Sequence, residues 1–147
     1  GLNSTLMPSV RPRTTLTPTT MFRGGAPYMA FGTPGGDQQE QWQLIMMLRH
    51  IHHGMNLQEA IDAPSFHTDH LPSSFWPREI NPGSLTMESR FSPVTLKALS
   101  ALGHEVTTGD AWSEGRLHAV AGEMDGSTLV VRAGANPRGM QGYAVAR

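Results

Sequence analysis

Hydrophobic side chains recur with a helical period in the first third of this chain. Between positions 37 and 53 they lie three and four residues apart, without an intervening glycine or proline, which is typical of an α-helix. Apolar residues also occupy other sides of this segment, so we expect the helix to be buried. The apolar positions are Leu44, Met47, Leu48, Ile51 and Met55 on one side, and Trp42, Ile45 and Met46 on another.

Start and stop signals predict two further helices. Asn56 precedes a helix over 57–63, and Glu59 stands three residues on, as in a capping box. Ser92-Pro93 predicts the start of a helix that ends just before Gly103, because proline suits the first helical turn and glycine the position after the last. The residues expected to face inward on this helix are Leu96, Leu99 and Leu102.

Strands are predicted on both sides of these helices. Threonine-rich residues 14–22 favour an extended strand, and a Gly-Gly turn returns the chain into a second strand over 28–32. Further strands are predicted over 85–88, 104–108, 117–124 and 128–133, the last two joined as a hairpin by Asp125-Gly126. Because the helices are grouped rather than alternating with strands, the pattern indicates an α+β fold.

Three segments lack a period and are predicted to be loops. They cover residues 1–13, 65–83 and 134–147. In the middle loop, Phe66, Phe75 and Trp76 are expected to anchor the chain on the folded body.

Composition and charge narrow the class of protein. The 147 residues suit one domain or part of a larger one, and a net charge of −1 without charge runs argues against nucleic acid or an anionic membrane as partner. The absence of cysteine excludes a disulfide framework and a thiolate zinc site. No apolar run reaches the roughly 20 residues of a membrane helix. The loop-like start at Gly1 indicates a fragment or a processed subunit, whose compartment the sequence does not reveal.

The turn before the first helix is the main candidate site. Thr33-Pro34-Gly35-Gly36 links the strand to the helix, so backbone N–H groups and the positive end of a helix dipole meet there. Such a point attracts a phosphate, a carboxylate or the oxyanion of acyl transfer. The alternative is a tight connection without a ligand. Asp37 is expected to cap the helix.

Two other groups of residues are candidate sites. Thr14 and Thr15 could face one pocket if their strand ends or twists, and otherwise are two ordinary strand residues. Of the seven histidines, His50 and His53 have the spacing of metal ligands on a helix, but no carboxylate joins them. We therefore expect no metal site and no cofactor. We interpret these histidines as caps of the helix C-terminus or as side chains that pack against the aromatic residues of the 65–83 loop. A Ser-His-Asp triad has no motif to support it.

Several segments, in order along the chain, resemble the small subunit of the gamma-glutamyltransferase family. They are Arg11-Pro12-Arg13-Thr14-Thr15-Leu16-Thr17-Pro18-Thr19, Phe31-Gly32-Thr33-Pro34-Gly35-Gly36, Gly54 to Pro64, Phe66-His67, Leu71-Pro72, Ser92-Pro93, Leu102-Gly103-His104, Asn136-Pro137-Arg138 and Gly142-Tyr143.

The resemblance implies the four-layer αββα fold of the N-terminal nucleophile hydrolases, of which this chain would be the C-terminal portion of the small subunit. In that family a self-cleaved precursor yields a large and a small subunit, and the new N-terminal threonine is both nucleophile and base. The backbone N–H groups of Gly35 and Gly36 would then bind the oxyanion, and Thr14 and Thr15 would bind the substrate. The implied partners are a small gamma-glutamyl amide such as glutathione, the large subunit and the upstream segment.

The sequence also departs from the family pattern. Gly1 has no side chain and is not the nucleophile, which would lie upstream. Thr14-Thr15 stands where the family has Ser-Ser, and Asp37-Gln38-Gln39 follows the glycines where it has Ser-Arg. A related amidase or acylase with another acyl donor, a non-catalytic relative that keeps the fold, and an unrelated metal hydrolase are the alternatives.

Overall fold

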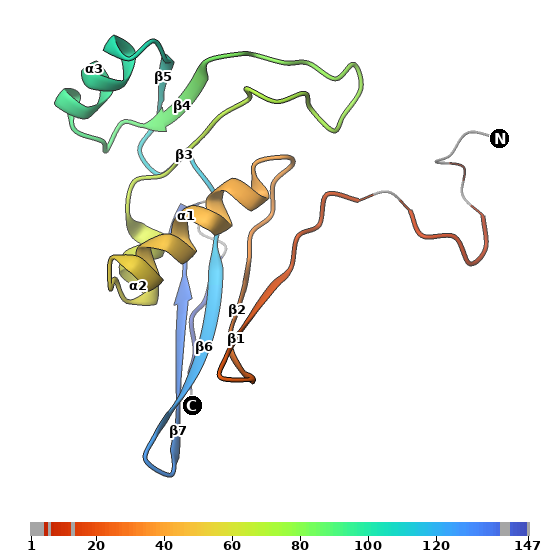
Figure 1. Cartoon of the computed structure of the whole chain (residues 1–147), viewed down its shortest axis with the longest axis vertical. Coiled ribbons are helices and arrows are strands. Elements are labelled where there is room, and N and C mark those ends of the chain that lie inside the picture. The colour runs from red at the N-terminus through yellow and green to blue at the C-terminus, as the bar shows by residue number, and fades with distance from the viewer. Residues whose placement is uncertain (1–4, 6, 13, 139–141, 147) are drawn as a thin grey trace.

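The computed structural model describes residues 5, 7–12, 14–138 and 142–146, which form two sheets and three helices (Figure 1). One antiparallel sheet has the order β1-β2-β6-β7, and a smaller sheet has the order β3-β4-β5. The strands of the larger sheet are β1 (Thr19–Arg23), β2 (Ala26–Gly32), β6 (His118–Asp125) and β7 (Thr128–Ala135). The smaller sheet contains β3 (Phe66–His67), β4 (Ser84–Glu88) and β5 (Glu105–Gly109). The helices are α1 (Gln39–His52), α2 (Leu57–Asp62) and α3 (Pro93–Ala101).

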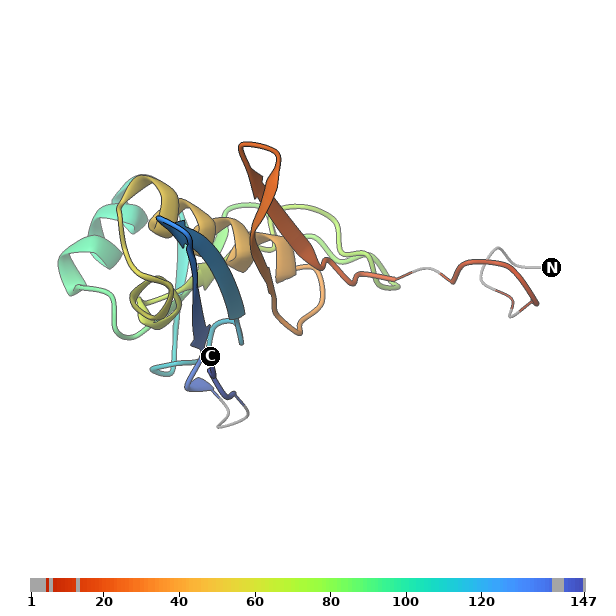
Figure 2. The same ribbon diagram turned by 90° about the horizontal axis from the view of Figure 1, so that it is seen from below.

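The hydrophobic core lies between the four-stranded sheet and the helices α1 and α2, which cover one of its faces (Figures 1 and 2). Register places Phe31 opposite Ala119, so a large and a small side chain share this face. Met46 from α1 and Ile61 from α2 fill the space above them and are completely buried. The smaller sheet is separate from this core, with β4 and β5 parallel and joined through α3.

Local capping signals predicted the helix ends well. The Asn56 side chain accepts a hydrogen bond from the Glu59 N–H, and the Glu59 carboxylate accepts one from the Asn56 N–H, so the predicted capping box is confirmed. Ser92 caps α3, with Pro93 in its first turn. The hairpin between β6 and β7 also forms, with Gly126 at φ +61° in its turn.

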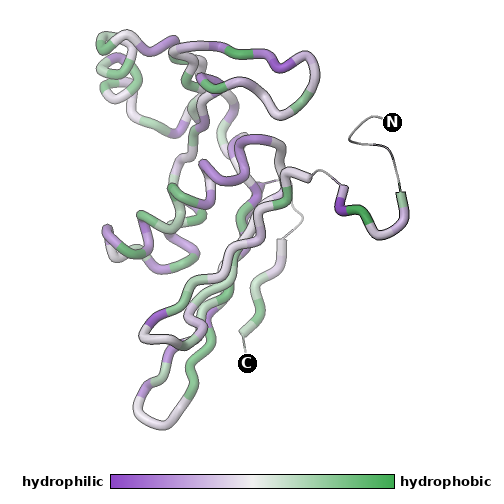
Figure 3. Tube along the Cα trace, turned by 45° about the vertical axis from the view of Figure 1, so that its right-hand side comes forward, coloured by the Kyte–Doolittle hydropathy of each residue, from purple (hydrophilic) through white to green (hydrophobic). Residues whose placement is uncertain are grey.

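Helix α1 is not buried all round, which corrects the prediction. Met46, Gln39 and Gln43 face the sheet, whereas the apolar residues Leu44, Leu48 and Ile51 lie on an exposed side. Figure 3 shows the hydrophobic middle of this helix following a hydrophilic first turn. The helix also begins at Gln39 rather than Asp37.

The extended strand predicted over 14–22 begins only at Thr19. Pro18 has no N–H to give to a ladder, and Thr15 and Thr17 before it bond to side chains of α1 instead. β7 continues to Ala135, into the segment predicted as loop. Of the predicted terminal loops, residues 1–4, 6, 13, 139–141 and 147 lie outside the described residues.

Two predictions about burial are wrong. Phe66 is partly buried in β3, but Phe75 and Trp76 are 56% and 91% exposed, so they do not anchor the 65–83 loop. Polar contacts hold that loop instead. Leu102 is 78% exposed and is the C-cap residue that follows the end of α3 at Ala101. Among the described residues no helix is long and apolar enough to cross a membrane.

A buried carboxylate joins the smaller sheet to the rest of the molecule. Glu88, at the end of β4, accepts hydrogen bonds from the Arg138 and Arg90 guanidinium groups. It also accepts from the N–H groups of Ser65 and Glu114. Burial alone would raise the pKa of Glu88, but the hydrogen bonds from Arg138, the Glu114 N–H and Arg90 outweigh it and hold that pKa below its ordinary value.

Replacing Glu88 with Gln should lower the free energy of unfolding by roughly 3–5 kcal/mol at neutral pH, because two buried guanidinium groups lose their counter-charge. Since the pKa of Glu88 is lowered in the folded state, its stabilisation is present at neutral pH and is lost as the pH falls through that value. The difference between wild type and E88Q in unfolding experiments should therefore shrink in acid.

The control is Glu123→Gln, which removes exposed ion pairs to Arg23 and Arg132. We expect less than about 1 kcal/mol from this change. Equal effects of the two substitutions would contradict the assigned role of Glu88.

Candidate active site

The Gly35–Gly36 turn is fixed by its neighbours rather than by its own flexibility. Gly35 has φ +142°, a conformation that favours glycine, and a Cβ atom there would lie 2.7 Å from the Trp42 ring. A Cβ atom on Gly36 would lie 3.1 Å from the exposed ring of Phe75. Only a glycine therefore fits at the first of these positions without displacing the turn.

The carbonyl groups of this turn are held, and this sets the direction of the N–H groups. Gln39 donates through Nε2 to the carbonyl oxygens of Gly35 and of Gly36, the latter at 3.1 Å. The Thr33 hydroxyl donates to the carbonyl oxygen of Pro34 at 2.8 Å. In a trans peptide the N–H points opposite to the C=O, so the N–H groups of Gly35 and Gly36 point away from these donors.

Within the described part of the chain, neither of these two N–H groups donates a hydrogen bond. Gly35 is exposed and Gly36 is partly exposed. Two adjacent N–H groups at the start of a 14-residue helix thus remain available to an anion or to the oxygen of a polarised carbonyl.

Gln39 also brings Thr15, one of the two predicted substrate residues, to the turn. Its Nε2 lies 3.0 Å from the carbonyl oxygen of Thr15 and 3.4 Å from the Thr15 hydroxyl. The Gln39 side chain is only 3% exposed, so these contacts are sheltered from water. The structure therefore places Thr15 beside Gly35 and Gly36, although twenty residues of chain separate them.

A second glutamine continues this connection one helical turn further on. Gln43 donates to the Thr17 hydroxyl at 2.8 Å and accepts from the Thr19 hydroxyl at 2.6 Å. Side chains four residues apart lie on the same face of a helix, so Gln39 and Gln43 hold one continuous extended segment.

The side chains of Thr14 and Asp37 have different local roles from that of Thr15. The Thr14 side chain is exposed, and its hydroxyl accepts from the Leu16 N–H at 3.1 Å. Asp37 does not cap the helix, which corrects the prediction. Its carboxylate accepts from the Ser73 hydroxyl and the Ser74 N–H, so it holds the 65–83 loop.

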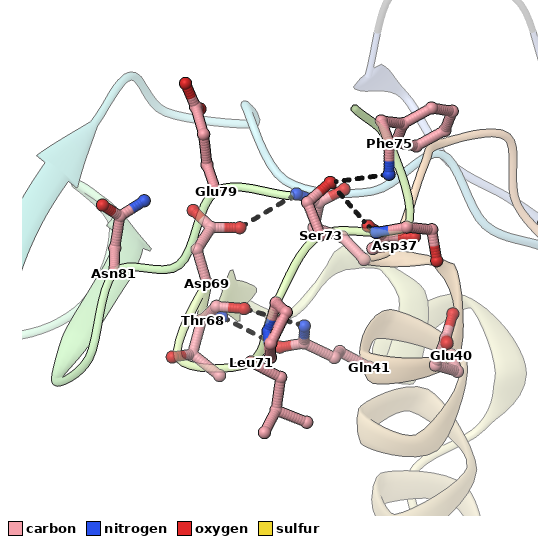
Figure 4. Close-up of a pocket in the computed structure, with 13 residues that line it drawn as sticks. Asp37, Glu40, Gln41, Thr68, Asp69, Leu71, Ser73, Phe75, Glu79 and Asn81 are labelled. Carbon is pink, nitrogen blue, oxygen red and sulfur yellow. Dashed lines mark hydrogen bonds between the residues drawn. The ribbon is translucent and has the colours of Figure 1, made fainter. Parts of the chain in front are cut away.

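A cleft of about 530 Å³ opens between this loop and the start of α1 (Figure 4). Gln41 closes one wall by accepting from the Thr68 N–H and donating to the Thr68 carbonyl oxygen. The cleft begins one residue after the glycine turn. Its acidic lining residues are Asp37, Glu40, Asp69 and Glu79.

A histidine and a buried glutamate lie behind the turn. His67 Nδ1 bonds to the Glu114 carboxylate, which also accepts from Trp42 Nε1 at 3.2 Å. Burial alone would lower the pKa of His67, but the hydrogen bond to Glu114 and the charges of Glu114 and Asp69 outweigh it. The pKa of His67 is therefore raised above its ordinary value.

The histidines at the end of α1 have a structural role. His50 Nδ1 contacts the carbonyl oxygen of Met55 at 2.7 Å, and its Nε2 contacts the Tyr28 hydroxyl at 2.6 Å. It therefore bonds a carbonyl group beyond the helix end, whereas the prediction had these histidines cap carbonyl groups of the helix itself. Among the described residues, no three histidine or carboxylate side chains gather closely enough to hold a metal ion.

Comparison with known proteins identifies the class and then the family. The fold is the α+β architecture of the N-terminal nucleophile hydrolases, which solved gamma-glutamyltranspeptidases share. The gamma-glutamyltranspeptidase family profile matches residues 2–146, and this chain belongs to that family.

Three relatives illustrate the relationship. The glutathione hydrolase proenzyme of Escherichia coli is 35% identical over 104 residues, which is 71% of this chain and 16% of that protein. The oxamate amidohydrolase proenzyme of Klebsiella pneumoniae is 34% identical over 116 residues, 79% of this chain and 21% of that protein. The solved structure of LmbA2991HD is 54% identical, covers 100% of this chain and 26% of that chain, and superposes with a TM-score of 0.84. The chain thus spans a quarter or less of its first curated relatives.

The sequence predicts the glycine turn and Thr15 as site residues, but it does not predict the side chains that connect them. Gln39 and Gln43 carried a signal, because two polar side chains four residues apart interrupt an apolar helix. The apolar spacing predicts that Trp42 lies in the hydrophobic core. Glu114 carried no local signal, because its partner His67 lies 47 residues earlier in the sequence.

Replacing Gln39 with Glu should destabilise the turn, because a carboxylate cannot donate to the carbonyl oxygens of Thr15, Gly35 and Gly36. We expect the free energy of unfolding to fall by about 3 kcal/mol. Amide hydrogen exchange of residues 33–38 should accelerate in Q39E.

The matched control is Gln43→Glu, which is equally buried but faces two hydroxyl groups that can rotate to donate to a carboxylate. Q43E should therefore change exchange in the turn little. If Q39E and Q43E change the exchange rates of residues 33–38 equally, the hydrogen bonds donated by Gln39 do not order the turn.

Proposed function

We propose that this chain is the C-terminal portion of the small subunit of an amidohydrolase or acyltransferase of the gamma-glutamyltransferase type. The single observation that carries this proposal is the pair of N–H groups at Gly35 and Gly36, which have no partner among the described residues and are held beside Thr15 by a buried glutamine. Family membership supports the same reaction class. The upstream segment and the large subunit are the proposed partners.

In the proposed reaction the nucleophile is the N-terminal threonine hydroxyl of the complete small subunit, outside this chain. Its oxygen bonds to the substrate carbonyl carbon while its proton passes to the threonine α-amine. The carbonyl oxygen becomes an oxyanion that accepts hydrogen bonds from the N–H groups of Gly35 and Gly36. The carbon–nitrogen bond then breaks, and the proton goes to the leaving amine.

A second attack completes the proposed reaction. Water or an acceptor amine adds to the acyl carbon and gives a proton to the threonine α-amine, and the new oxyanion accepts hydrogen bonds from the same two N–H groups. The ester carbon–oxygen bond then breaks, the α-amine returns the proton to the threonine oxygen, and the acid or the new amide leaves. The Asp37 carboxylate is held by the Ser73 hydroxyl and the Ser74 N–H in the loop.

The acyl group is proposed to be gamma-glutamyl, with the hydroxyl groups of Thr14 and Thr15 binding its α-carboxylate. The relatives include a glutathione hydrolase and an oxamate amidohydrolase, and oxamate is a much smaller molecule than glutathione. The second therefore supports the alternative of a smaller acyl donor. Rates of the complete protein on a glutamyl anilide and on oxamate separate these two candidates.

Gly35→Ala in the complete protein should lower kcat by about a hundredfold or more, scaled from the roughly 3 kcal/mol of one oxyanion donor. The added methyl group would meet Trp42 and displace the turn. Steady-state kinetics on the better donor provides the measurement.

The control for backbone strain is Gly126→Ala, in the distant hairpin of β6 and β7, where φ is also positive and the space is open. G126A should leave kcat unchanged. Normal turnover by a folded G35A protein would overturn the oxyanion assignment.

Thr14→Val and Thr15→Val should each raise KM about tenfold, because a hydroxyl bonded to a charged carboxylate contributes about 1.5 kcal/mol. Valine keeps the branched shape, so folding should change little. Thr20→Val, on an exposed position of β1, is the control. KM values equal to that of T20V would remove both threonines from the site.

A further inference from the structure

His67 lies between two carboxylates that lead to opposite ends of the Gly35–Gly36 turn. Its Nδ1 bonds to Glu114, and its Nε2 lies 3.6 Å from the Asp69 carboxylate. The side chain of His67 is 14% exposed and that of Glu114 is 6% exposed, so the first pair is sheltered from solvent. His67 has no place in the acyl-transfer steps described above.

The Glu114 branch reaches the turn through a tryptophan. Glu114 accepts a hydrogen bond from Trp42 Nε1. The rings of Trp42 and His67 pack edge to face, with their centroids 6.0 Å apart. Trp42 fits between two glycines, since Cβ atoms on Gly35 and Gly115 would lie 2.7 Å and 3.2 Å from it. The position of the indole therefore sets the space available to the Gly35 backbone.

The same segment also touches the residue before the turn. The Arg116 N–H donates to the Thr33 hydroxyl at 2.9 Å, and that hydroxyl donates to the Pro34 carbonyl oxygen. The peptide of Pro34 and Gly35 carries the Gly35 N–H. Residues 114–116 thus reach the turn in two ways: indirectly, through the hydrogen bond of Glu114 to Trp42, and directly, through the Arg116 N–H.

The Asp69 branch reaches the other end. Asp69 accepts from Gln38 Nε2 at 3.2 Å, and Gln38 is the first residue before α1, two positions after Gly36. Because both branches start at one imidazole, the turn is held from its two sides by groups that depend on His67.

The charged groups facing His67 are few. Glu114 comes from the segment between β5 and β6, and Asp69 from the loop after β3. On the neighbouring elements α1 presents Trp42, and β4 pairs Thr86 with His67. Glu88 lies one step further, bonded to the N–H of Glu114.

We propose that His67 is a positioning residue for the oxyanion turn, holding Gly35 through Glu114 and Trp42 and holding Gln38 through Asp69. This inference rests on the proposed function of that turn. An imidazolium ion donates from both ring nitrogens, whereas a neutral imidazole donates from one. Loss of the proton therefore ends the ion pair between His67 and Asp69, whereas Nδ1 can keep its hydrogen bond to Glu114. The Gln38 end of the turn is then held less firmly, and the transition state loses well-placed N–H donors.

The direction of the pH dependence follows from the charges. The two carboxylates raise the pKa of His67, so the doubly donating form persists above the ordinary value and is lost as the pH rises through the raised value. The advantage of wild type over a variant without this imidazole should accordingly be largest in mildly acidic solution and smallest in alkaline solution.

The experiment compares the complete protein with H67Q across pH. We expect kcat of H67Q to be lower about tenfold near pH 6, with KM changed less than about twofold, because positioning acts on the transition state. The ratio of wild-type to H67Q kcat should fall as the pH rises and stay above one at alkaline pH, because the neutral imidazole keeps its bond to Glu114. Titration of the nucleophile affects both proteins and cancels in the ratio. His104→Gln, on an exposed histidine at the start of β5, should leave kcat unchanged.

A readout independent of activity is the ¹⁹F resonance of Trp42 in 5-fluorotryptophan protein, assigned with Trp42→Phe. It should titrate in wild type, not titrate in H67Q, and titrate at lower pH in Glu114→Gln, which removes the charge that raises the pKa of His67. A flat kcat ratio, or a Trp42 resonance unaffected by H67Q, would overturn the inference. If Trp42 follows His67 but Gly35→Ala has normal activity, the proposed function fails instead.

Discussion

The buried carboxylate of Glu88 is the interaction on which the rest of this structure depends. It lies at the end of β4 and accepts hydrogen bonds from Arg138 and from the N–H groups of Ser65 and Glu114. Arg138 in turn donates to the Ile61 carbonyl oxygen in α2. An ion this deep in the protein is stable only when its oxygens are fully bonded, so these segments are constrained to converge on it.

That convergence carries through to the candidate active site. By fixing the backbone of Glu114, the carboxylate of Glu88 places the Glu114 side chain against His67 and Trp42. Trp42 lies against Gly35. On the other side of the turn, the buried amide of Gln39 holds the carbonyl groups and Thr15. A flexible glycine pair thereby becomes a pre-organised pair of donors, which is what stabilisation of an oxyanion requires.

The exposed apolar side of α1 shows that a hydrophobic pattern alone does not establish burial. Leu44, Leu48 and Ile51 have the spacing that predicts a buried helix, yet they are exposed in the described structure. The chain covers 26% of the solved relative LmbA2991HD. The hydrophobic pattern predicts which side of a helix is suited to burial. Whether that side is buried depends on whether another segment packs against it.

The sequence by itself determined the features whose causes lie within a few residues. The capping box at Asn56, the start of α3 at Ser92, the glycine turn and the α+β order all follow from capping, periodicity and turn chemistry. The series of motifs also identified the family. These signals are local, and tertiary contacts preserved them.

Only the tertiary structure decided which side chains meet. Gln39 joins Thr15 across 24 residues, Glu114 joins His67 across 47, and Arg138 joins Glu88 across 50. Asp37 binds a distant loop instead of capping its own helix, and the strand predicted from Thr14 starts only at Thr19. In each case a long-range hydrogen bond satisfies a polar group that the local sequence left with several equivalent choices, and the relative placement of sheet and helix selects among them.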